Sequence, residues 1–243
     1  MKNNKLLRFY IDTNTITGII SGILMVLLSI LMNCFPDNEI AQIILRDVLM
    51  IFLLGFVFPL YFILIRQKED LSVLGIHKNK LKRSLLVNII FAAALLAMFL
   101  KEKSQPVTFN LQSFYAISYI FVAGIFEMIF IYGFLRYQFE RAFGIIPAVI
   151  LTAVFYSFHH AGFQPEFMKL FWVGIMYVAV FYITQNIFII FPFFWGVGAV
   201  WDVLINSEAG RGIENMESFV IAIVLLICMV IAVLVIRKNS NFY

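Results

Sequence analysis

Charge is scarce in this chain. Only 13% of its 243 residues are charged, whereas 63% are hydrophobic, and the mean hydropathy is +0.95. A soluble domain carries roughly 25% charged residues. The composition therefore argues against an ordinary soluble fold and predicts a polytopic membrane protein.

Cysteine and the usual catalytic signatures are also rare. The two cysteines, Cys34 and Cys228, fall in or at the edge of apolar segments, where we expect buried thiols. Their spacing fits neither a disulfide framework nor a zinc motif. The sequence has no nucleophile elbow, phosphate loop or thiolate cluster, and no internal repeat or low-complexity linker. The polar residues inside apolar segments are thus the candidates for chemistry.

Long apolar runs predict an all-α bundle of about eight transmembrane helices, because a span needs roughly 20 apolar residues. The first run follows a basic N-terminus and lacks a small-x-small cleavage site, so we expect a retained helix; a cleaved signal peptide is the alternative. We treat 1–243 as a single integral membrane domain. The predicted helices cover residues 16–35, 48–65, 84–100, 113–135, 145–160, 167–183, 187–205 and 218–236.

The basic residues predict the orientation of the bundle. With both termini in the cytoplasm, most of the 18 lysines and arginines lie in cytoplasmic pieces, as the positive-inside rule requires. The same distribution accounts for the net charge of +4 through attraction to anionic lipid, so no nucleic acid partner is expected. The inside set is Lys2, Lys5, Arg8, Arg66, Lys68, Lys78, Lys80, Lys82, Arg83, Arg136, Arg141, Arg237 and Lys238; the outside set is Arg46, Lys101, Lys103, Lys169 and Arg211.

Glu127 is the most informative single residue. It is the only ionisable acid or base of the apolar segment 113–135. A carboxylate at such a depth costs about 2.5–3.5 kcal/mol on insertion scales, so it is rarely present without a use. A general base or proton carrier is the functional interpretation, and a neutral carboxyl hydrogen-bonded to a neighbouring helix is the structural one.

Two histidines, His159 and His160, close the next apolar run. Adjacent residues on a helix point about 100° apart, so only one of them can share a face with a given partner. Interfacial histidines at a helix end are the structural alternative. A carboxylate on the neighbouring helix could instead hold an imidazole in a useful tautomer or share a water with it.

Asp202 is the third polar group inside an apolar segment, on the predicted helix 187–205. It either lines the same cavity as Glu127 or caps the helix near the outer interface. Two histidines and two acids make only a weak metal signal, so no cofactor is predicted, although a divalent metal stays open.

The order of these parts resembles the CPBP family of intramembrane proteases, which includes the CAAX prenyl proteases and the bacteriocin-immunity-type (Abi) proteins. That family carries the motifs EExxxR, FxxxH, and HxxxN or HxxxD. Similar segments here begin at Glu127, Phe155 and Gly198, and Leu71–His77 is similar to the segment that often precedes the core. The resemblance covers about residues 68–206, with the core in helices four to seven, peripheral helices in 1–67, and a last helix and cytoplasmic tail in 207–243.

The resemblance implies roles for the site residues. Glu127 would activate water with His159 as its partner, and Asp202 would stand on the oxyanion side. Met128, Tyr132 and Gly198 depart from the motifs, where the family has glutamate, arginine and histidine. An ionised Asp202 would repel an oxyanion, and His160 is a candidate to replace the missing histidine.

The helix boundaries leave one geometric conflict. Counted from the cytoplasmic ends of their helices, Glu127 lies ~12 Å deep and His159 ~21 Å deep, at 1.5 Å per residue. The two can meet only if the helix of Glu127 extends beyond Leu135, through 136–143, or if one helix is tilted or shifted.

Three functions fit these features. The first is an intramembrane endopeptidase that cleaves a membrane-bound peptide, protein or lipidated substrate in the bilayer. The second is an inactive relative that acts as a scaffold, immunity factor or envelope regulator, which Met128 and Gly198 favour. The third is a proton-coupled transporter, which would prefer repeated halves that the sequence lacks. We expect a multi-pass protein of a bacterial cell membrane.

Overall fold

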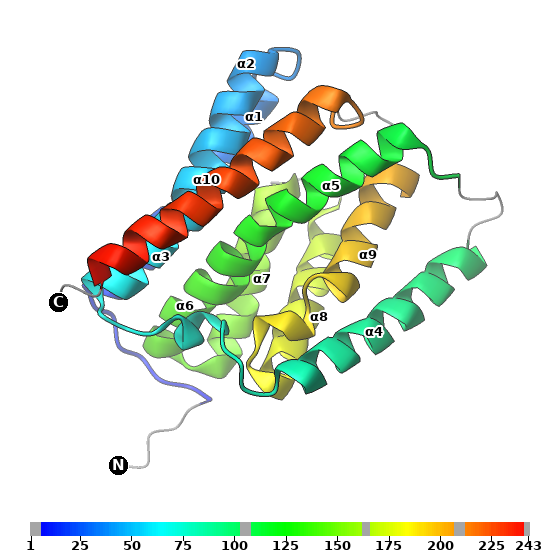
Figure 1. The fold of residues 1–243 in the computed structure, drawn as a ribbon. Helices are drawn as coiled ribbons and strands as arrows, with labels where there is room; N and C mark the ends of the chain where they lie inside the picture. The colour runs from blue at the N-terminus through cyan, green and yellow to red at the C-terminus, as the bar shows by residue number, and fades with distance from the viewer. Residues whose placement is uncertain (1–5, 103–107, 162–165, 207–211, 241–243) are drawn as a thin grey trace.

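The structure is a computed structural model, and it describes residues 6–102, 108–161, 166–206 and 212–240. Within these ranges the chain is all-helical (Figure 1). Six helices are long and apolar enough to cross a membrane, and two shorter apolar helices accompany them. The predicted polytopic helical bundle is thereby confirmed. Lys2, Lys5, Lys103 and Arg211, which the charge count used, lie outside the described residues.

Several spans are built from consecutive helical segments. The elements are α1 (Thr13–Asn33), α2 (Glu39–Gln42), η1 (Ile43–Val57), α3 (Phe58–Tyr61), η2 (Phe62–Arg66), η3 (Leu71–Leu74), α4 (Leu81–Glu102), α5 (Leu111–Phe126), η4 (Glu127–Leu135), α6 (Arg136–Phe143), α7 (Ile145–Ala161), α8 (Phe167–Thr184), η5 (Ile187–Ile189), α9 (Phe193–Trp201), η6 (Asp202–Asn206) and α10 (Met216–Ser240). Residues 39–66 form one continuous helix, and so do residues 111–143.

The second span begins earlier than predicted. Asn38 caps it by accepting a hydrogen bond from the backbone N–H of Ala41 at 3.0 Å. The polar residues that follow Asn38 hid this start from the hydropathy pattern. Pro59 lies near the start of α3 and does not end the span, because the surrounding turns stay helical.

The predicted helix 187–205 is wrong at its N-terminal end. The chain makes the short turn η5, and α9 starts only at Phe193, after Pro192, which has no N–H to donate. Asn88 of α4 satisfies the interrupted backbone: its Oδ1 accepts from the N–H of Phe194 at 2.6 Å, and its amide donates to the carbonyl of Phe188 at 3.0 Å. A polar side chain inside the bundle thus supplies the hydrogen bonds that the interrupted backbone needs and that lipid could not provide.

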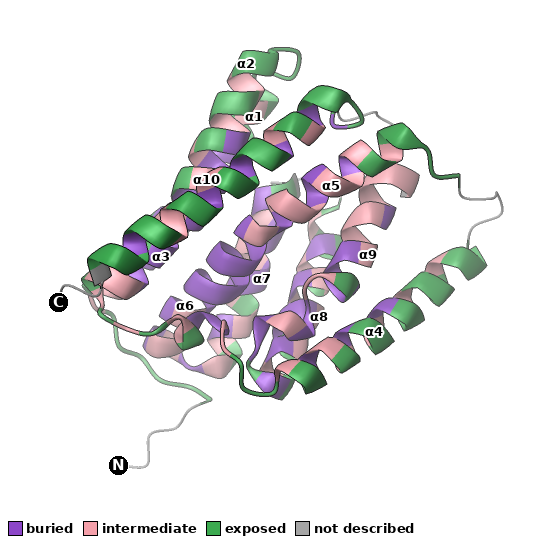
Figure 2. Cartoon of the chain, in the orientation of Figure 1, coloured by how far each residue is buried: buried purple, intermediate pink, exposed green. Residues whose placement is uncertain are grey.

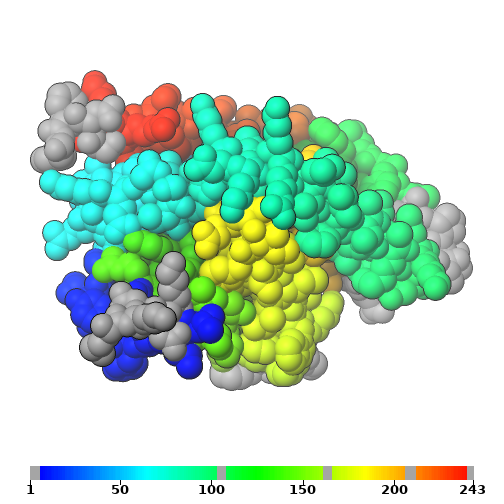
Figure 3. All heavy atoms as spheres, turned by 90° about the horizontal axis from the view of Figure 1, so that it is seen from below, coloured from blue at the N-terminus to red at the C-terminus, as the bar shows by residue number. Residues whose placement is uncertain are grey.

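The N-terminal segment, the 67–80 loop and the end of α10 share one end of the bundle. The backbone N–H of Arg8 donates to the carbonyl of Phe143, and Asp12 pairs with Arg141 at 2.7 Å. Arg237, near the end of α10, is close enough to Asp70 of the 67–80 loop to interact with it electrostatically. Figure 3 views this end, where the blue N-terminal segment and the cyan loop lie beside the green α6 and the yellow α8. The first and last spans therefore place their basic ends together.

Burial divides the bundle into a lipid-facing shell and a packed centre (Figure 2). The outer faces of α1, α4 and α10 are exposed and apolar, whereas every residue of η4 is buried. Exposed leucines and isoleucines on three outer helices suit a hydrocarbon surrounding. The central position belongs to the segment that starts at Glu127.

Candidate active site

Glu127 lies where α5 passes into η4, and its residue is 6% exposed. Two side chains hold its carboxylate. The indole Nε1–H of Trp195, from α9, donates to Oε2 at 2.8 Å, and Nε2 of His160, from α7, lies 3.2 Å from Oε1. An acid, an imidazole and an indole from three separate helices therefore meet inside the bundle.

The depth conflict is resolved by the length of the helix that carries Glu127. That helix runs without interruption to Phe143, so Glu127 lies ~24 Å from its end, close to the ~21 Å of His159 in α7, at 1.5 Å per residue. Of the two solutions that the sequence left open, the extension through 136–143 is present. Without it the carboxylate and the histidines would lie at different depths.

The histidine in ion-pair contact with Glu127 is His160, not the His159 of the FxxxH motif. His159 is 9% exposed and turns toward α1, where its Nδ1 lies 2.9 Å from Oγ of Ser29. Ser29 Oγ also lies 3.1 Å from the carbonyl of Met25, which can only accept a hydrogen bond. If Ser29 gives its proton to that carbonyl, Nδ1 of His159 carries a proton and Nε2 keeps its lone pair.

Glu127, His159 and His160 still form one cluster, although the two histidines contact different partners. One ligand atom each of Glu127, His159 and His160 lies within 4.8 Å of the others, and such a set could hold a divalent metal ion. Glu127 Oε2 is already bonded to Trp195, and the Nδ1 of His159 lies beside Ser29. A metal would therefore draw on Oε1 of Glu127 and the two Nε2 atoms.

The approach of Trp195 to Glu127 depends on a glycine. A Cβ at Gly124, one turn before Glu127, would lie 2.1 Å from the six-membered ring of Trp195. Only glycine leaves room for the indole to lie against α5 with its N–H at the carboxylate. The contact between α5 and α9 thus requires a glycine at position 124 of α5 and a tryptophan at position 195 of α9.

Three tyrosines form a cluster beside the imidazole of His160. Tyr156 packs edge-on against the ring of His160, with centroids 4.5 Å apart. Tyr132 packs against Tyr156 at 5.8 Å and against Tyr177 of α8 at 5.9 Å. Tyr132 is fully buried, and its hydroxyl has no hydrogen-bond partner among the described residues. Glu127 is within electrostatic range of all three.

Asp202 lies outside the group formed by Glu127 and the two histidines. It starts η6, and Nζ of Lys169, from α8, contacts its Oδ1 at 2.8 Å. Both side chains are partly exposed, at 50% for Lys169 and 32% for Asp202. Asp202 still acts electrostatically on Tyr156 and Tyr177. It is thus a neighbour of the tyrosines rather than a direct partner of Glu127.

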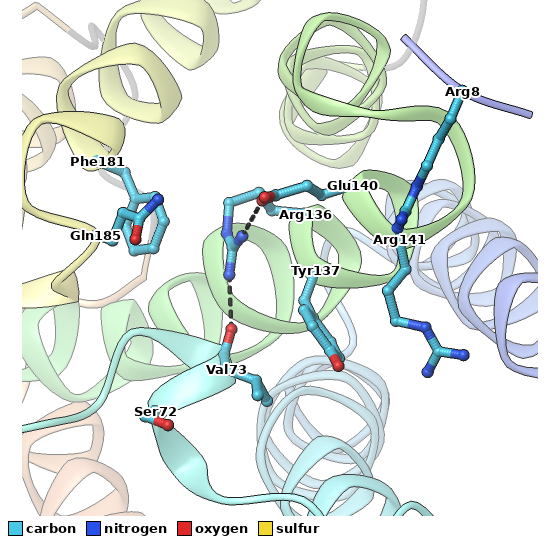
Figure 4. A pocket seen from close by; sticks show the side chains of 9 residues that line it. All are labelled: Arg8, Ser72, Val73, Arg136, Tyr137, Glu140, Arg141, Phe181 and Gln185. Atoms are coloured by element: carbon cyan, nitrogen blue, oxygen red, sulfur yellow. Dashed lines mark hydrogen bonds and ion pairs between the residues drawn. The ribbon is translucent and has the colours of Figure 1, made fainter. Parts of the chain in front are cut away.

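A separate pocket of about 220 Å³ opens at the end of the bundle that holds the N-terminal segment (Figure 4). Most charged side chains that line this pocket form ion pairs or hydrogen bonds with other residues of the protein. Arg136 contacts Glu140 and the carbonyl of Val73, each at 2.7 Å, and Arg141 contacts Asp12. The pocket includes none of the three grouped residues, so it is not the site of the buried carboxylate.

The segment that holds these side chains is similar to one protein family. Residues 109–204 match the model of the Rce1-like family, described as type II CAAX prenyl endopeptidase Rce1-like. The matched segment contains Glu127, the histidine pair and Gly198. The match covers less than half of the chain, and it supports the resemblance of this segment to the CPBP family. The matched family is one of CAAX-type endopeptidases. No curated protein and no solved structure matches the chain.

Two of the three positions that depart from the family motifs, 128 and 132, hold buried neutral side chains. Met128 is 3% exposed and belongs to the hydrophobic core, and Tyr132 belongs to the tyrosine cluster. Gly198 faces the hydroxyl of Tyr177. Relative to the family motif, the site therefore lacks the second glutamate and the arginine, while it keeps the buried acid Glu127.

Sequence reasoning missed Trp195, Ser29 and the tyrosines. The sequence gives Trp195 no evident role, and it predicts a peripheral helix over 16–35, yet α1 supplies the group beside His159. One signal was present: Tyr156 precedes His160 by four residues, which places both on one helix face. The approach of Ser29 and Tyr177 has no local signature, because both come from other helices.

Proposed function

We propose that this protein is an intramembrane endopeptidase that hydrolyses a membrane-associated peptide or lipidated substrate with water activated by Glu127 and His160. The observation that supports this best is the 3.2 Å contact between Glu127 Oε1 and His160 Nε2 inside a membrane bundle. A buried carboxylate that only needed neutralisation could be protonated. Pairing with an imidazole gives it a route to accept and pass on a proton.

In the proposed reaction Glu127 acts as the general base. A water between Oε1 and the substrate gives its proton to the carboxylate while its oxygen attacks the carbonyl carbon of the scissile amide. The C–N bond then breaks, and the leaving nitrogen takes up the proton. His160 relays or shares this proton, and the N–H of Trp195 fixes the orientation of the carboxylate.

His159 has a positioning role in this proposal. Its Nδ1 is beside Ser29, and its ring packs edge-on against Phe126, the residue before Glu127, with centroids 5.0 Å apart. This contact fixes the end of α7 against the start of η4. His159 thereby keeps His160 in register with the carboxylate.

A cleavage assay tests the proposal. The purified protein would be placed in lipid nanodiscs with an internally quenched peptide ending in a CAAX sequence, in farnesylated and in unmodified form. We expect the wild type to cleave the farnesylated peptide and Glu127→Gln to lose at least about 100-fold in kcat, since general acid–base catalysis contributes 10²–10⁴. Glu140→Gln, remote from the site, is the matched control.

The alternative, an inactive family member that binds a partner, predicts a different result. Met128 and Gly198 are the residues that favour it. If the wild type cleaves neither peptide, or if Glu127→Gln cleaves as fast as the wild type, the hydrolytic proposal is wrong. A fold that works only by binding would also tolerate His160→Ala, whereas the proposed base pair would not.

A further inference from the structure

Gly198 leaves a space that the hydroxyl of another helix fills. A Cβ built at Gly198 would lie 2.6 Å from Oη of Tyr177, and the next side-chain atom, Cδ2 of Leu95, would be 3.7 Å away. The hydroxyl therefore occupies the point from which a side chain at position 198 would start. Gly198 is also where the similar motif of the family carries a histidine.

Tyr177 is well placed to present a donor at the site. Its residue is 2% exposed, and its ring is held edge-on by Tyr132 and by Phe194, at 5.9 and 5.1 Å. It reaches this position from α8, a helix that carries neither Glu127 nor the histidines. Both Glu127 and Asp202 act on it electrostatically.

A second observation points to a ligand at this cluster. The hydroxyl of Tyr132, adjacent to Tyr177, is fully buried and lacks a partner among the described residues. Buried polar groups in proteins nearly always have a partner, in the protein or in something bound to it. The neighbouring hydroxyl of Tyr156 interacts with that of Tyr132, but no described group meets the geometry of a full hydrogen bond to it.

We propose that the hydroxyl of Tyr177 is the oxyanion donor of the site, in place of the histidine that Gly198 has replaced. The inference rests on the proposed hydrolytic function. When the water oxygen bonds to the carbonyl carbon, the π electrons of the C=O bond move to oxygen, and Tyr177 O–H donates to that oxyanion. When the carbonyl reforms, the C–N bond breaks and the amine leaves with the proton held by Glu127.

This assignment accounts for the pairing of Asp202. An uncompensated carboxylate near Tyr177 would oppose a developing negative charge. Lys169 contacts Asp202 at 2.8 Å, so the local field near the hydroxyl is closer to neutral. A tyrosine donor needs no positive charge of its own, and hydroxyl side chains serve as oxyanion donors in other acyl-transfer sites.

The test is a set of single and double substitutions assayed with the farnesylated quenched peptide in nanodiscs. Tyr177→Phe keeps the ring and removes the donor, so we expect kcat to fall roughly 100- to 1,000-fold with little change in KM. Gly198→Ala pushes the hydroxyl aside and should cause a similar fall. In Tyr177→Phe the nearest atom to that Cβ is 3.7 Å away, so adding Gly198→Ala should cost little more.

Tyr182→Phe is the matched control, because it removes a hydroxyl from the same helix that bonds Glu140 at 2.9 Å, away from the site. We expect its kcat to stay within about twofold of the wild type. Thermal unfolding of every variant in detergent separates misfolding from loss of the donor.

When the wild type is active, the variants separate the oxyanion proposal from the hydrolytic one. If Glu127→Gln is inactive and Tyr177→Phe retains wild-type kcat, the oxyanion role is wrong and the hydrolytic function stands. Equal, additive losses from Tyr177→Phe and Gly198→Ala would also overturn the role. If the wild type is inactive, both proposals fall together.

Discussion

At the scale of single residues, the site depends on which atoms reach the carboxylate of Glu127. Hydropathy identified the acid and the histidine pair, but the choice between His159 and His160 required coordinates. The two residues are adjacent in sequence, and their rings diverge: one contacts Ser29 and the other contacts Glu127. The contact from Trp195 adds a donor that a buried carboxylate needs.

The hydrogen bond from Trp195 gives a residue-scale prediction. Trp195→Phe removes the donor and leaves Oε2 of Glu127 buried without it, so we expect a loss of about 1–3 kcal/mol in stability and at least tenfold lower cleavage. Thermal and denaturant unfolding in detergent measure the first, and the nanodisc assay measures the second.

Trp172→Phe is the control for that variant, because Trp172 is 63% exposed on α8 and faces the surroundings of the bundle. Equal stability of the two variants would show that the indole N–H contributes nothing at Glu127.

At the scale of elements, α1 belongs to the site as well as to the periphery. Its N-terminus is fixed by Asp12, whose side chain caps the helix through Thr15 and pairs with Arg141 of α6. Farther along, Ser29 meets His159. The same helix therefore carries both the ion pair with Arg141 and the contact with His159.

The cap of α1 predicts a pH-dependent stability. Partial burial raises the pKa of Asp12, but hydrogen bonds from Thr15 and the charge of Arg141 outweigh it, so the folded pKa lies below the usual 3.8. The ionised form stabilises the fold fully above the unfolded pKa, and this contribution is lost as pH falls through the lower folded value. Asp12→Ala should cost about 0.5–2 kcal/mol at neutral pH.

Thermal unfolding of wild type and Asp12→Ala in detergent, from about pH 7 down to about pH 3, measures this effect. The difference in Tm should shrink only below about pH 4, where the wild-type carboxyl is protonated. Asp12→Asn, which keeps a capping side chain but loses the charge, should lie between the two. A difference in Tm that stays constant over the whole range would contradict the assignment to the ionised form.

At the scale of the whole molecule, the described parts of the chain begin and end at the same end of the bundle. The basic N-terminal segment, the loop after η2 and the end of α10 are neighbours. The positive-inside rule places that end in the cytoplasm, which remains a prediction.

A native cysteine can test this orientation. The expected burial of both thiols is wrong for Cys34, which is exposed at the C-terminal cap of α1, at the end of the bundle opposite Arg8. Cys228 lies within α10 and is partly buried. We expect a membrane-impermeant maleimide to label intact cells through Cys34 and to fail after Cys34→Ser. Lys238→Cys, in the Cys34→Ser background, should react only after permeabilisation. Labelling in the reverse pattern would invert the topology.

The sequence by itself determined the bundle and most of its spans, because hydrocarbon tolerates only apolar helices and their lengths follow from its thickness. It also identified Glu127, since a lone acid in an apolar run is costly and conspicuous. The sequence predicted helix boundaries less well where polar side chains bind the ends of a helix. Asn38 caps the second span earlier than expected, and Asn88 of α4 stabilises the break before α9.

Only the tertiary structure decided how the site is completed. His160 rather than His159 at Glu127, Trp195 over Gly124, and Tyr177 in the space at Gly198 all depend on residues far apart in sequence. Hydropathy reports whether a side chain avoids water, but not which neighbouring helix it faces. Packing between helices fixes that choice through contacts of a few ångströms, and one absent Cβ is enough to change the partner.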